Sequence, residues 1–264
     1  MENNRKKSFI VLAISFFLFS FFIAVLMNGS HWVSRLKESY FITVELKNNV
    51  DEERANALEN KLLEQPEVKG VRYIAKDEAF RNLQKELGVV IPKSENALPN
   101  SLLVYFNSVD EIEKIQNLLE PEESIKEVFI DADFIAQIQK RVDTINSFSI
   151  FIIITNIAIA AMIYLNFKMA VENEYLRLTI VTPGHERNNL KAQNFNLLPF
   201  TGGTITGLLV FLNLYAIIRN KMMSFAPGIY LLTTNQLIWT LFGVLFLYNL
   251  IIWFTPVLMN RRKK

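Results

Sequence analysis

The stretch YFITVELKNNVDEERANALENKLLEQPEVKGVRYI, residues 40–74, predicts a strand, a helix and a second strand. Residues 40–46 are rich in β-branched and aromatic side chains, as is typical of strands. In residues 51–65 apolar side chains recur every three or four positions, which is the period of a helix with one buried face. Residues 68–74 again favour a strand. The stretch is therefore a βαβ unit.

A second βαβ unit follows the first. Residues 101–106 and 125–130 predict strands, and residues 109–119 between them predict a helix. The tripeptide Val-Asp-Glu opens the helix of each unit, and a further predicted helix, residues 76–87, separates the units. Two such units predict an α+β domain of the ferredoxin-like split βαβ type, with its helices on one face of the sheet.

Long uncharged stretches flank this domain, and each is long enough to cross a bilayer, which takes about 20 helical residues. They predict transmembrane helices at residues 8–27, 148–168, 196–218 and 236–258. The chain is thus an α-helical membrane protein with an inserted extracytoplasmic domain, residues 28–147. A predicted helix that begins at Asp131 runs into the second span. It is either a stiff joint that transmits motion or a plain anchor.

The first span also has features of a signal peptide, because Arg5, Lys6 and Lys7 precede it. Its apolar run, Phe9–Met27, is longer than the usual signal-peptide core of about 7–15 residues. The sequence of residues 28–32 makes a poor cleavage site. We therefore interpret this span as an uncleaved anchor.

Basic residues predict the orientation in the membrane. Residues 1–7 and 259–264 carry basic clusters, which places both termini in the cytoplasm. Residues 169–195 then form a cytoplasmic coupling loop, and residues 219–235 form a short extracytoplasmic loop. Two basic residues in the latter loop run against the positive-inside rule.

Composition argues against several classes of function. The net charge of +2 gives no basis for nucleic-acid binding, and the absence of cysteine rules out disulfides and thiol chemistry. The sequence has no Walker A motif, no GxSxG and no HExxH, and its histidines, His31 and His185, are far apart in the chain. We expect no catalytic, cofactor-binding or metal site. Acidic clusters such as Glu52-Glu53 are interpreted as solvated helix starts rather than calcium or glycosidase sites.

The cores of the predicted spans carry no acidic or basic residue, which argues against an ion-coupled transporter. Within the third span, Gly202-Gly203-x-x-x-Gly207 has the small-xxx-small spacing that lets two helices approach closely. We expect Gly203 and Gly207 to pack against a neighbouring helix.

Two segments are candidates for contacts with other proteins. The first is an apolar patch that docks a partner, formed by Phe80, Leu83, Leu87, Val89, Val90 and Ile91. The alternative is that these residues cap the core of the domain. The second is the loop 169–195, whose size suits a coupling helix that contacts a cytoplasmic protein. The alternative there is a simple connector.

The whole chain resembles FtsX, the membrane subunit of a bacterial cell-division complex of the ABC type. The resemblance rests on the first span, on FITVELKNNVDEERANALENKLLEQPEVKGVRYIAKDEAF (residues 41–80), on ALPNSLLVYF (residues 97–106), on IKEVFID and on three further spans. Residues that fit the family pattern are Val68, Val71, Tyr73, Ile74, Lys76, Glu78, Ala79, Leu98, Pro99 and Ser101.

This resemblance implies a function. FtsX-type proteins pair with a cytoplasmic ATPase, FtsE, and carry no substrate. ATP-driven movement reaches the extracytoplasmic domain, which recruits or activates peptidoglycan hydrolases, or their activators, during septation. The resemblance also implies a multi-pass protein of the bacterial inner membrane that forms a homodimer there.

The family segment that meets the ATPase is matched by Glu172, Glu174, Arg177, Leu178 and Thr182. Ile180 stands in place of the family's glycine, Pro183-Gly184 follows, and a later family motif is displaced to Pro199-Phe200. Two alternative functions remain. One is an export permease of a related ABC family that handles lipids or lipoproteins, and the other is an ATPase-independent anchor whose outer domain binds a cell-wall protein.

Overall fold

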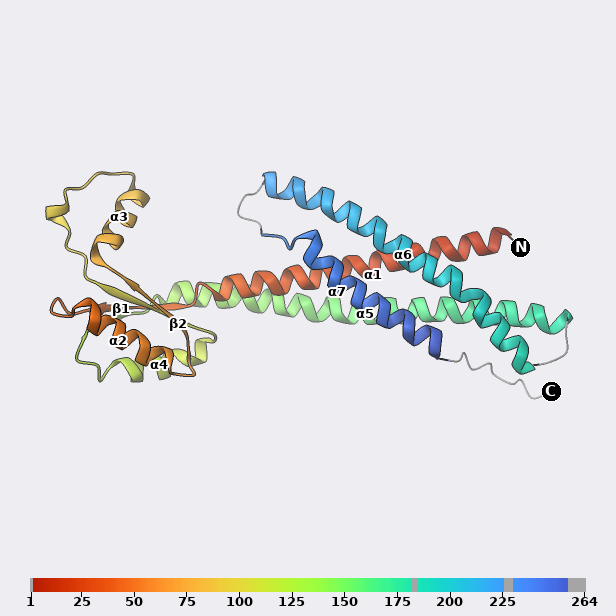
Figure 1. The fold of residues 1–264 in the computed structure, drawn as a ribbon, viewed down its shortest axis with the longest axis horizontal. Coiled ribbons are helices and arrows are strands. Elements are labelled where there is room, and N and C mark those ends of the chain that lie inside the picture. The colour runs from red at the N-terminus through yellow and green to blue at the C-terminus, as the bar shows by residue number, and fades with distance from the viewer. Residues whose placement is uncertain (1, 182–184, 226–229, 256–264) are drawn as a thin grey trace. The chain divides into compact units, whose positions relative to one another are not determined.

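The computed structural model describes residues 2–181, 185–225 and 230–255, and the chain divides into two compact units. The inserted unit is Val33–Ile145, and the helical unit combines Met1–Trp32 with Asn146–Lys264. The elements are α1 (Glu2–Lys37), β1 (Phe41–Leu46), α2 (Glu52–Leu63), β2 (Val68–Ile74), α3 (Lys76–Leu87), η1 (Lys93–Glu95), β3 (Ser101–Phe106), η2 (Val109–Glu111), α4 (Ile112–Leu119), β4 (Ile125–Phe129), α5 (Ala132–Val181), α6 (His185–Phe225) and α7 (Thr234–Phe254). Figure 1 labels the α-helices and the strands β1 and β2.

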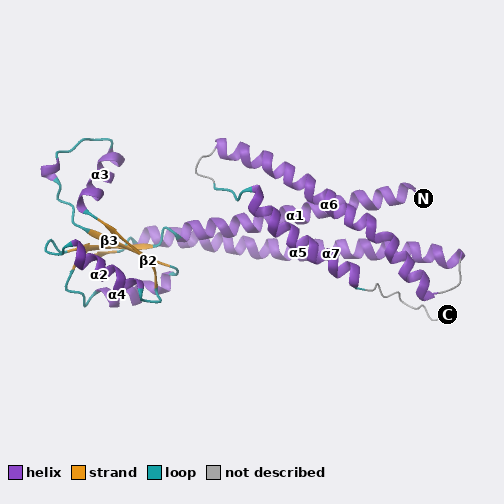
Figure 2. Ribbon diagram, viewed as in Figure 1, coloured by secondary structure: helices purple, strands orange, loops and turns teal. Residues whose placement is uncertain are grey.

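A sheet forms the centre of the inserted unit (Figure 2). It has four strands in the order β2-β3-β1-β4, and each neighbouring pair of strands is antiparallel. β3 lies between β1 and β2, which are joined through α2. Likewise β1 lies between β3 and β4, which are joined through α4. Each βαβ unit is therefore split by a strand of the other, as in the split βαβ arrangement that the sequence predicts.

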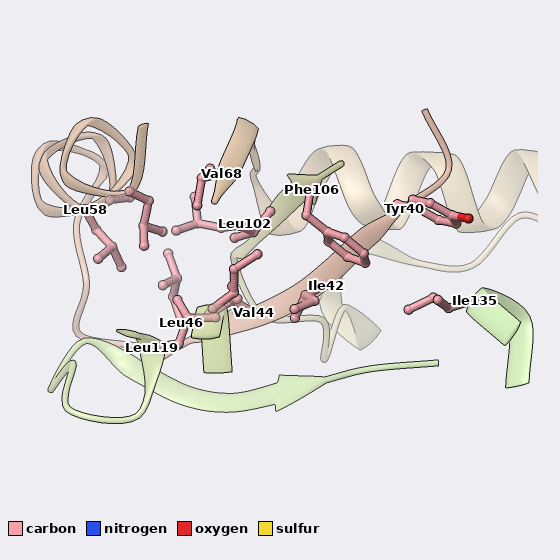
Figure 3. Packing of buried hydrophobic residues seen from close by; sticks show 14 of the residues in the cluster. Tyr40, Ile42, Val44, Leu46, Leu58, Val68, Leu102, Phe106, Leu119 and Ile135 are labelled. Carbon is pink, nitrogen blue, oxygen red and sulfur yellow. The ribbon is translucent and has the colours of Figure 1, made fainter. Parts of the chain in front are cut away.

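One face of this sheet carries the core of the inserted unit. Alternate residues of β1 and β3 are buried, and Figure 3 shows Ile42, Val44, Leu102 and Phe106 packed together. The ring of Tyr40 stacks on that of Phe106, with the ring centroids 5.5 Å apart. Apolar side chains of α2, α4 and the first turns of α5 complete the core. Burial of one such large apolar side chain contributes about 1.5–3 kcal/mol.

Helix α3 departs from the predicted arrangement. Figures 1 and 2 show α2 and α4 on one side of the sheet and α3 on the other. Its one buried side chain, Phe80, is not part of the core beneath α2 and α4. The expectation that all helices share one face is therefore wrong for α3. The physical reason is that side chains of α2, α4 and the first turns of α5 already fill the core face of the sheet.

Local capping explains where several helices begin. The Asp51 carboxylate accepts a hydrogen bond from the backbone N–H of Arg54 (2.9 Å) and caps α2. Ser108 and Glu111 form a capping box, and the turn that they close is the 3-10 helix η2, so the predicted helix 109–119 becomes α-helical only at Ile112. Asp131 caps α5 by accepting from the N–H of Phe134 (2.9 Å). These acidic residues are structural caps.

The helical unit contains four helices that are long and apolar enough to cross a membrane, counted over the described residues. Phe200 of α6 lies at the centre of their packing. Its ring lies 5.3 Å from that of Phe16 in α1, 5.1 Å from that of Phe167 in α5 and 6.3 Å from that of Tyr248 in α7. One aromatic side chain therefore contacts the other three helices.

The helices differ in length from the predicted spans. α1 and α5 have 36 and 50 residues, because their polar flanks continue the helix beyond the apolar stretch. α7 ends at Phe254 and not at residue 258, since Thr255 is extended (ψ 115°) and the residue before a proline disfavours the helical conformation. The predicted tail 259–264 lies outside the described residues.

Candidate functional site

The segment between β2 and β3 forms a small lobe that is closed by two asparagines. Asn100 accepts a hydrogen bond from the N–H of Lys76 (2.9 Å), at the start of α3, where Ala75 provides no side-chain cap. Asn96 donates to the carbonyl of Lys76 (3.2 Å) and accepts from the N–H of Leu98 (3.0 Å). The end of the lobe is thereby tied to its beginning.

The tip of the lobe is ordered by the end of α3. Gly88 adopts the left-handed conformation (φ 66°) that terminates a helix at low cost in glycine. The N–H of Val89 donates to the carbonyl of Gln84 (3.2 Å), and the side-chain amide of Gln84 donates to the carbonyl of Ile91 (2.5 Å). These bonds fix the backbone of residues 88–91 against the helix.

This tip presents apolar side chains to solvent. Val90 is 97% exposed, and Leu87 and Val89 are also exposed, whereas Leu83 and Ile91 are half-buried. Phe80 is only 5% exposed, so its side chain is not available to a partner. We call Leu87, Val89 and Val90, with Leu83 and Ile91 at their edge, the tip patch.

The predicted coupling residues lie at the end of α5, in the helical unit. Arg177 pairs with Glu174 across one helical turn (3.4 Å), Glu172 is half-buried, and Leu178 packs partly into the bundle with Val171. The structure therefore places these four predicted residues within two turns of one helix. The fifth, Thr182, lies outside the described residues.

The same end of α5 carries exposed apolar residues that sequence reasoning missed. Leu176, Ile180 and Val181 are exposed, and Ile180 is 87% exposed. Leu176 and Ile180 are four residues apart, so they lie on the same side of the helix. The sequence pattern that could have revealed these residues is the recurrence of apolar side chains at helical spacing beyond Lys168, where the predicted span ends.

Gly203 and Gly207 face α1 within the helical unit. A Cβ atom on Gly203 would lie 2.9 Å from Cβ of Leu12. A Cβ atom on Gly207 would lie 2.6 Å from the carbonyl oxygen of Ala13 and 2.9 Å from the backbone nitrogen of Phe17. Only glycine at these positions allows the two backbones to come this close.

The described residues contain no group of three or more His, Cys, Asp and Glu side chains that could hold a metal ion. Two tyrosines of the inserted unit have shifted pKa values. Burial, and then the charge of Asp143, raises the pKa of Tyr40; burial, and then the charge of Glu52, raises the pKa of Tyr73. Both hydroxyls therefore stay protonated at neutral pH. Neither tyrosine belongs to the tip patch or to the predicted coupling residues.

Comparison with known proteins identifies the inserted unit. Residues 40–142 match the family model of the FtsX extracellular domain. The inserted unit belongs to the FtsX extracellular-domain family. The match ends well before the coupling segment and the paired glycines, so within it lies only one candidate surface, the tip patch. FtsX-family proteins are permease-like subunits of cell-division complexes of the ABC type.

One solved structure that resembles the chain is the crystal structure of extracellular domain 1 of FtsX from S. pneumoniae in complex with undecyl-maltoside. It is 17% identical over 34% of this chain and 93% of the other, with a TM-score of 0.31. No curated protein matches the chain.

Proposed function

We propose that this chain is a non-transporting membrane subunit of the FtsX type that transmits ATP-driven movement. A cytoplasmic ATPase of the FtsE type binds the end of α5, and the inserted unit recruits or activates a peptidoglycan hydrolase, or its activator, at the septum. Two copies of the chain form the membrane part of the complex in the bacterial inner membrane. Both termini lie in the cytoplasm, as the basic clusters at the two ends favour.

The observation that carries this proposal is the continuity of α5. This single helix contains residues of the inserted unit's core (Ile135, Ile138, Val142), the second apolar stretch and the coupling residues. At 1.5 Å per residue, 50 residues span about 75 Å, more than twice the roughly 30 Å of a hydrocarbon core. One helix therefore connects the proposed ATPase contact with the core of the inserted unit.

The end of α5 has the properties of a docking surface. Leu176, Ile180 and Val181 lie beyond the predicted span and are exposed beside the Arg177–Glu174 pair. Apolar side chains grouped at an aqueous surface and bordered by charges are typical of protein interfaces. Under the proposed orientation this surface faces the cytoplasm, where an ATPase would be found.

The tip patch supports the hydrolase contact in the same way. Its backbone is fixed by Gly88 and Gln84, so its apolar side chains are presented without a large loss of conformational entropy on binding. A partner that covers Leu87, Val89 and Val90 removes apolar surface from water, at about 25 cal/mol for each Å² covered.

Co-purification tests the ATPase contact. The chain is purified with the candidate ATPase from the same bacterium, and we expect Ile180→Asp and Arg177→Glu to reduce recovery of that ATPase. Arg35→Glu is the matched control, because Arg35 is exposed and pairs with Glu38 within the inserted unit. Equal recovery with all three variants would count against the contact.

Pull-down of a purified hydrolase or its activator tests the other contact. Val90→Asp should abolish binding, whereas Leu63→Asp, an exposed apolar position on α2, should leave it unchanged. In cells, Val90→Asp should leave daughter cells unseparated, while the ATPase still binds the variant protein. Normal separation with this variant would show that the tip patch does not dock the partner.

A further inference from the structure

The residues that enter α7 from the α6–α7 connection are held by side chains of two other helices. The indole N–H of Trp32 in α1 donates to the carbonyl of Tyr230 (3.0 Å). The guanidinium Nε of Arg219 in α6 donates to the carbonyl of Leu231 (3.4 Å). Two successive carbonyls of a non-helical segment thus accept hydrogen bonds from two different helices.

Both the backbone N–H and the backbone carbonyl of Leu232 form hydrogen bonds with side chains. Its N–H donates to Oδ1 of Asn28 in α1 (2.9 Å), and its carbonyl accepts from the hydroxyl of Tyr215 in α6 (2.8 Å). The hydroxyl has a single hydrogen, and the carbonyl is nearer to it than Oδ1 of Asn28 (3.3 Å). The side-chain amide of Asn28 also donates to the carbonyl of Ala24 (2.7 Å), which fixes its orientation.

The side chain of Leu232 anchors the same residue in an apolar cluster. It packs partly buried against the cluster formed by Ala24, Phe211, Leu237 and Leu241, which come from α1, α6 and α7. Leu232 immediately precedes Thr233, the N-cap of α7, and Leu237 is the fourth residue of that helix. An apolar residue before the cap that packs on this position is a hydrophobic staple, which fixes the angle at which the chain enters a helix.

α7 begins directly after this anchor. Thr233 accepts a hydrogen bond from the N–H of Gln236 (3.3 Å), and the Gln236 side chain accepts one from the N–H of Thr233 (2.8 Å). Because the capping box follows Leu232 without an intervening residue, the first turn of α7 is placed directly by the contacts of Leu232 with α1 and α6.

We propose that residues 230–232 form a latch that ties the end of α1 to the start of α7. Trp32 is the last residue of α1 in the helical unit, and the helix continues to Lys37 before β1 begins. A displacement of α6 or α7 therefore moves the part of α1 that leads into the inserted unit. This inference rests on the proposed function and adds α1 to α5 as a second helix that carries movement to the inserted unit.

The latch also accounts for a basic residue that runs against the positive-inside rule. Arg219 lies in the predicted extracytoplasmic loop, yet its guanidinium group has a specific role, because it binds the carbonyl of Leu231. A lysine at this position would not reproduce the planar, directional donor.

Distance measurements by pulsed electron paramagnetic resonance test the latch. The chain contains no cysteine, so Ser30→Cys in α1 and Asn235→Cys in α7, both at exposed positions, carry the only two spin labels of each copy, and dilution with unlabelled chain restricts the measured distances to those within one copy. In the full chain in lipid nanodiscs we expect one narrow distance distribution. Asn28→Leu and Tyr215→Phe should each broaden it or shift it, and Tyr215→Phe removes only a hydroxyl, so the fold is retained.

Asn213→Leu is the matched control. Asn213 lies on α6 half a turn from Tyr215, and its amide donates to the carbonyl of Leu209 in its own helix (2.8 Å). This variant should leave the distribution unchanged. If Asn28→Leu and Tyr215→Phe also leave it unchanged, the latch does not place α7 against α1, and the proposal is overturned.

Cell separation tests the proposed role of α1 in carrying movement to the inserted unit. With the ATPase still co-purifying, the latch variants should give unseparated cells. Broadened distances together with normal separation would overturn the role of α1. If the unsubstituted chain neither recovers the ATPase nor supports division, the proposed function has failed, whatever the spin-label distances show.

Discussion

The two units of the chain bury different kinds of side chain. Among the described residues, the buried polar side chains are Ser20, Asn156, Asn188, Gln193 and Thr204, and all of them belong to the helical unit. The core of the inserted unit is apolar, and its charged groups pair at the surface, as in Arg72–Glu78 and Lys126–Glu45. The inserted unit is therefore built as a water-soluble domain.

The helical unit has the opposite pattern, which suits lipid. Its outward side chains, among them Phe151, Ile154 and Ile157, are apolar and exposed. Lipid is as apolar as these side chains, so helices gain little by burying them against one another, and association depends on close packing and hydrogen bonds. The close approach at Gly207 and the bond from Asn249 to Thr204 (3.2 Å) are interactions of that kind.

The largest effect should come from opening the apolar core. Phe106→Ala removes a fully buried ring that stacks on Tyr40, and such a change costs about 3–5 kcal/mol. Hydrogen–deuterium exchange of the full chain in nanodiscs should show faster exchange throughout β1, β3 and α2, with α6 and α7 unaffected. Phe129→Ala is the control, since Phe129 is 45% exposed. Equal exchange in the two variants would contradict the assigned core.

Glycine substitution tests the helical unit. Gly207→Ala places a methyl group within 2.6 Å of the Ala13 carbonyl, and because both backbones must separate we expect a loss of about 1–3 kcal/mol. The loss should appear as faster exchange in α1 and α6, or a lower melting temperature of the purified chain. Gly243→Ala on α7 is the control, because no atom lies within 4 Å of the added methyl group. Similar melting temperatures for both variants would contradict the packing of α1 on α6.

Removal of one hydroxyl should have a smaller effect. Tyr40 donates a hydrogen bond to Oε1 of Gln139 in α5 (2.6 Å), and Tyr40→Phe deletes this bond while keeping the stacked ring. A net loss of about 0.5–1.5 kcal/mol is expected for the inserted unit. Tyr105→Phe, on the other face of β3, serves as the control and should change stability less. Unchanged exchange in Tyr40→Phe would show that the bond is not formed in solution.

The pH dependence of stability should be the smallest effect. The folded pKa of Tyr40 is raised above its unfolded value, chiefly by burial, so the unfolded chain loses this proton first as pH rises. The contribution to stability is complete below the ordinary tyrosine pKa of about 10 and is lost as pH rises through the folded value. Denaturation of the inserted unit should therefore become easier above that pH, and Tyr40→Phe should reduce the slope. An identical slope in the variant would contradict this assignment.

Much of the inserted unit could be predicted from the sequence because its signals are local. The alternation of buried side chains in β1 and β3, and the helical period of α2, are visible residue by residue. The placement of α3 could not be predicted in this way. Its apolar stripe of Phe80, Leu83 and Leu87 looks like a core face, but which side of the sheet it meets depends on loop lengths and on the space already filled by α2, α4 and α5.

The candidate sites could likewise be predicted only as far as their signals are local. The spacing of Gly203 and Gly207 indicates a close helix contact, but only the structure shows that α1 is the neighbour. Residues 80–91 indicate an apolar surface, yet burial separates Phe80 from the exposed Val90. The contacts of Asn28 with Leu232 and of Trp32 with Tyr230 join positions about 200 residues apart, and one sequence has no local pattern that reveals them.

The central claim is that α5 carries movement between its two ends as a stiff helix. Insertion of a tetraglycine segment between Ile145 and Asn146, at the boundary of the two units, would break that stiffness, and insertion of a tetra-alanine segment would keep the helix. The measurement is cell separation by the full chain that carries each insertion, with ATPase co-purification as the check that the helical unit is intact. We predict that the glycine variant binds the ATPase but leaves cells unseparated, whereas the alanine variant retains function. Normal separation with the glycine insertion would contradict the account.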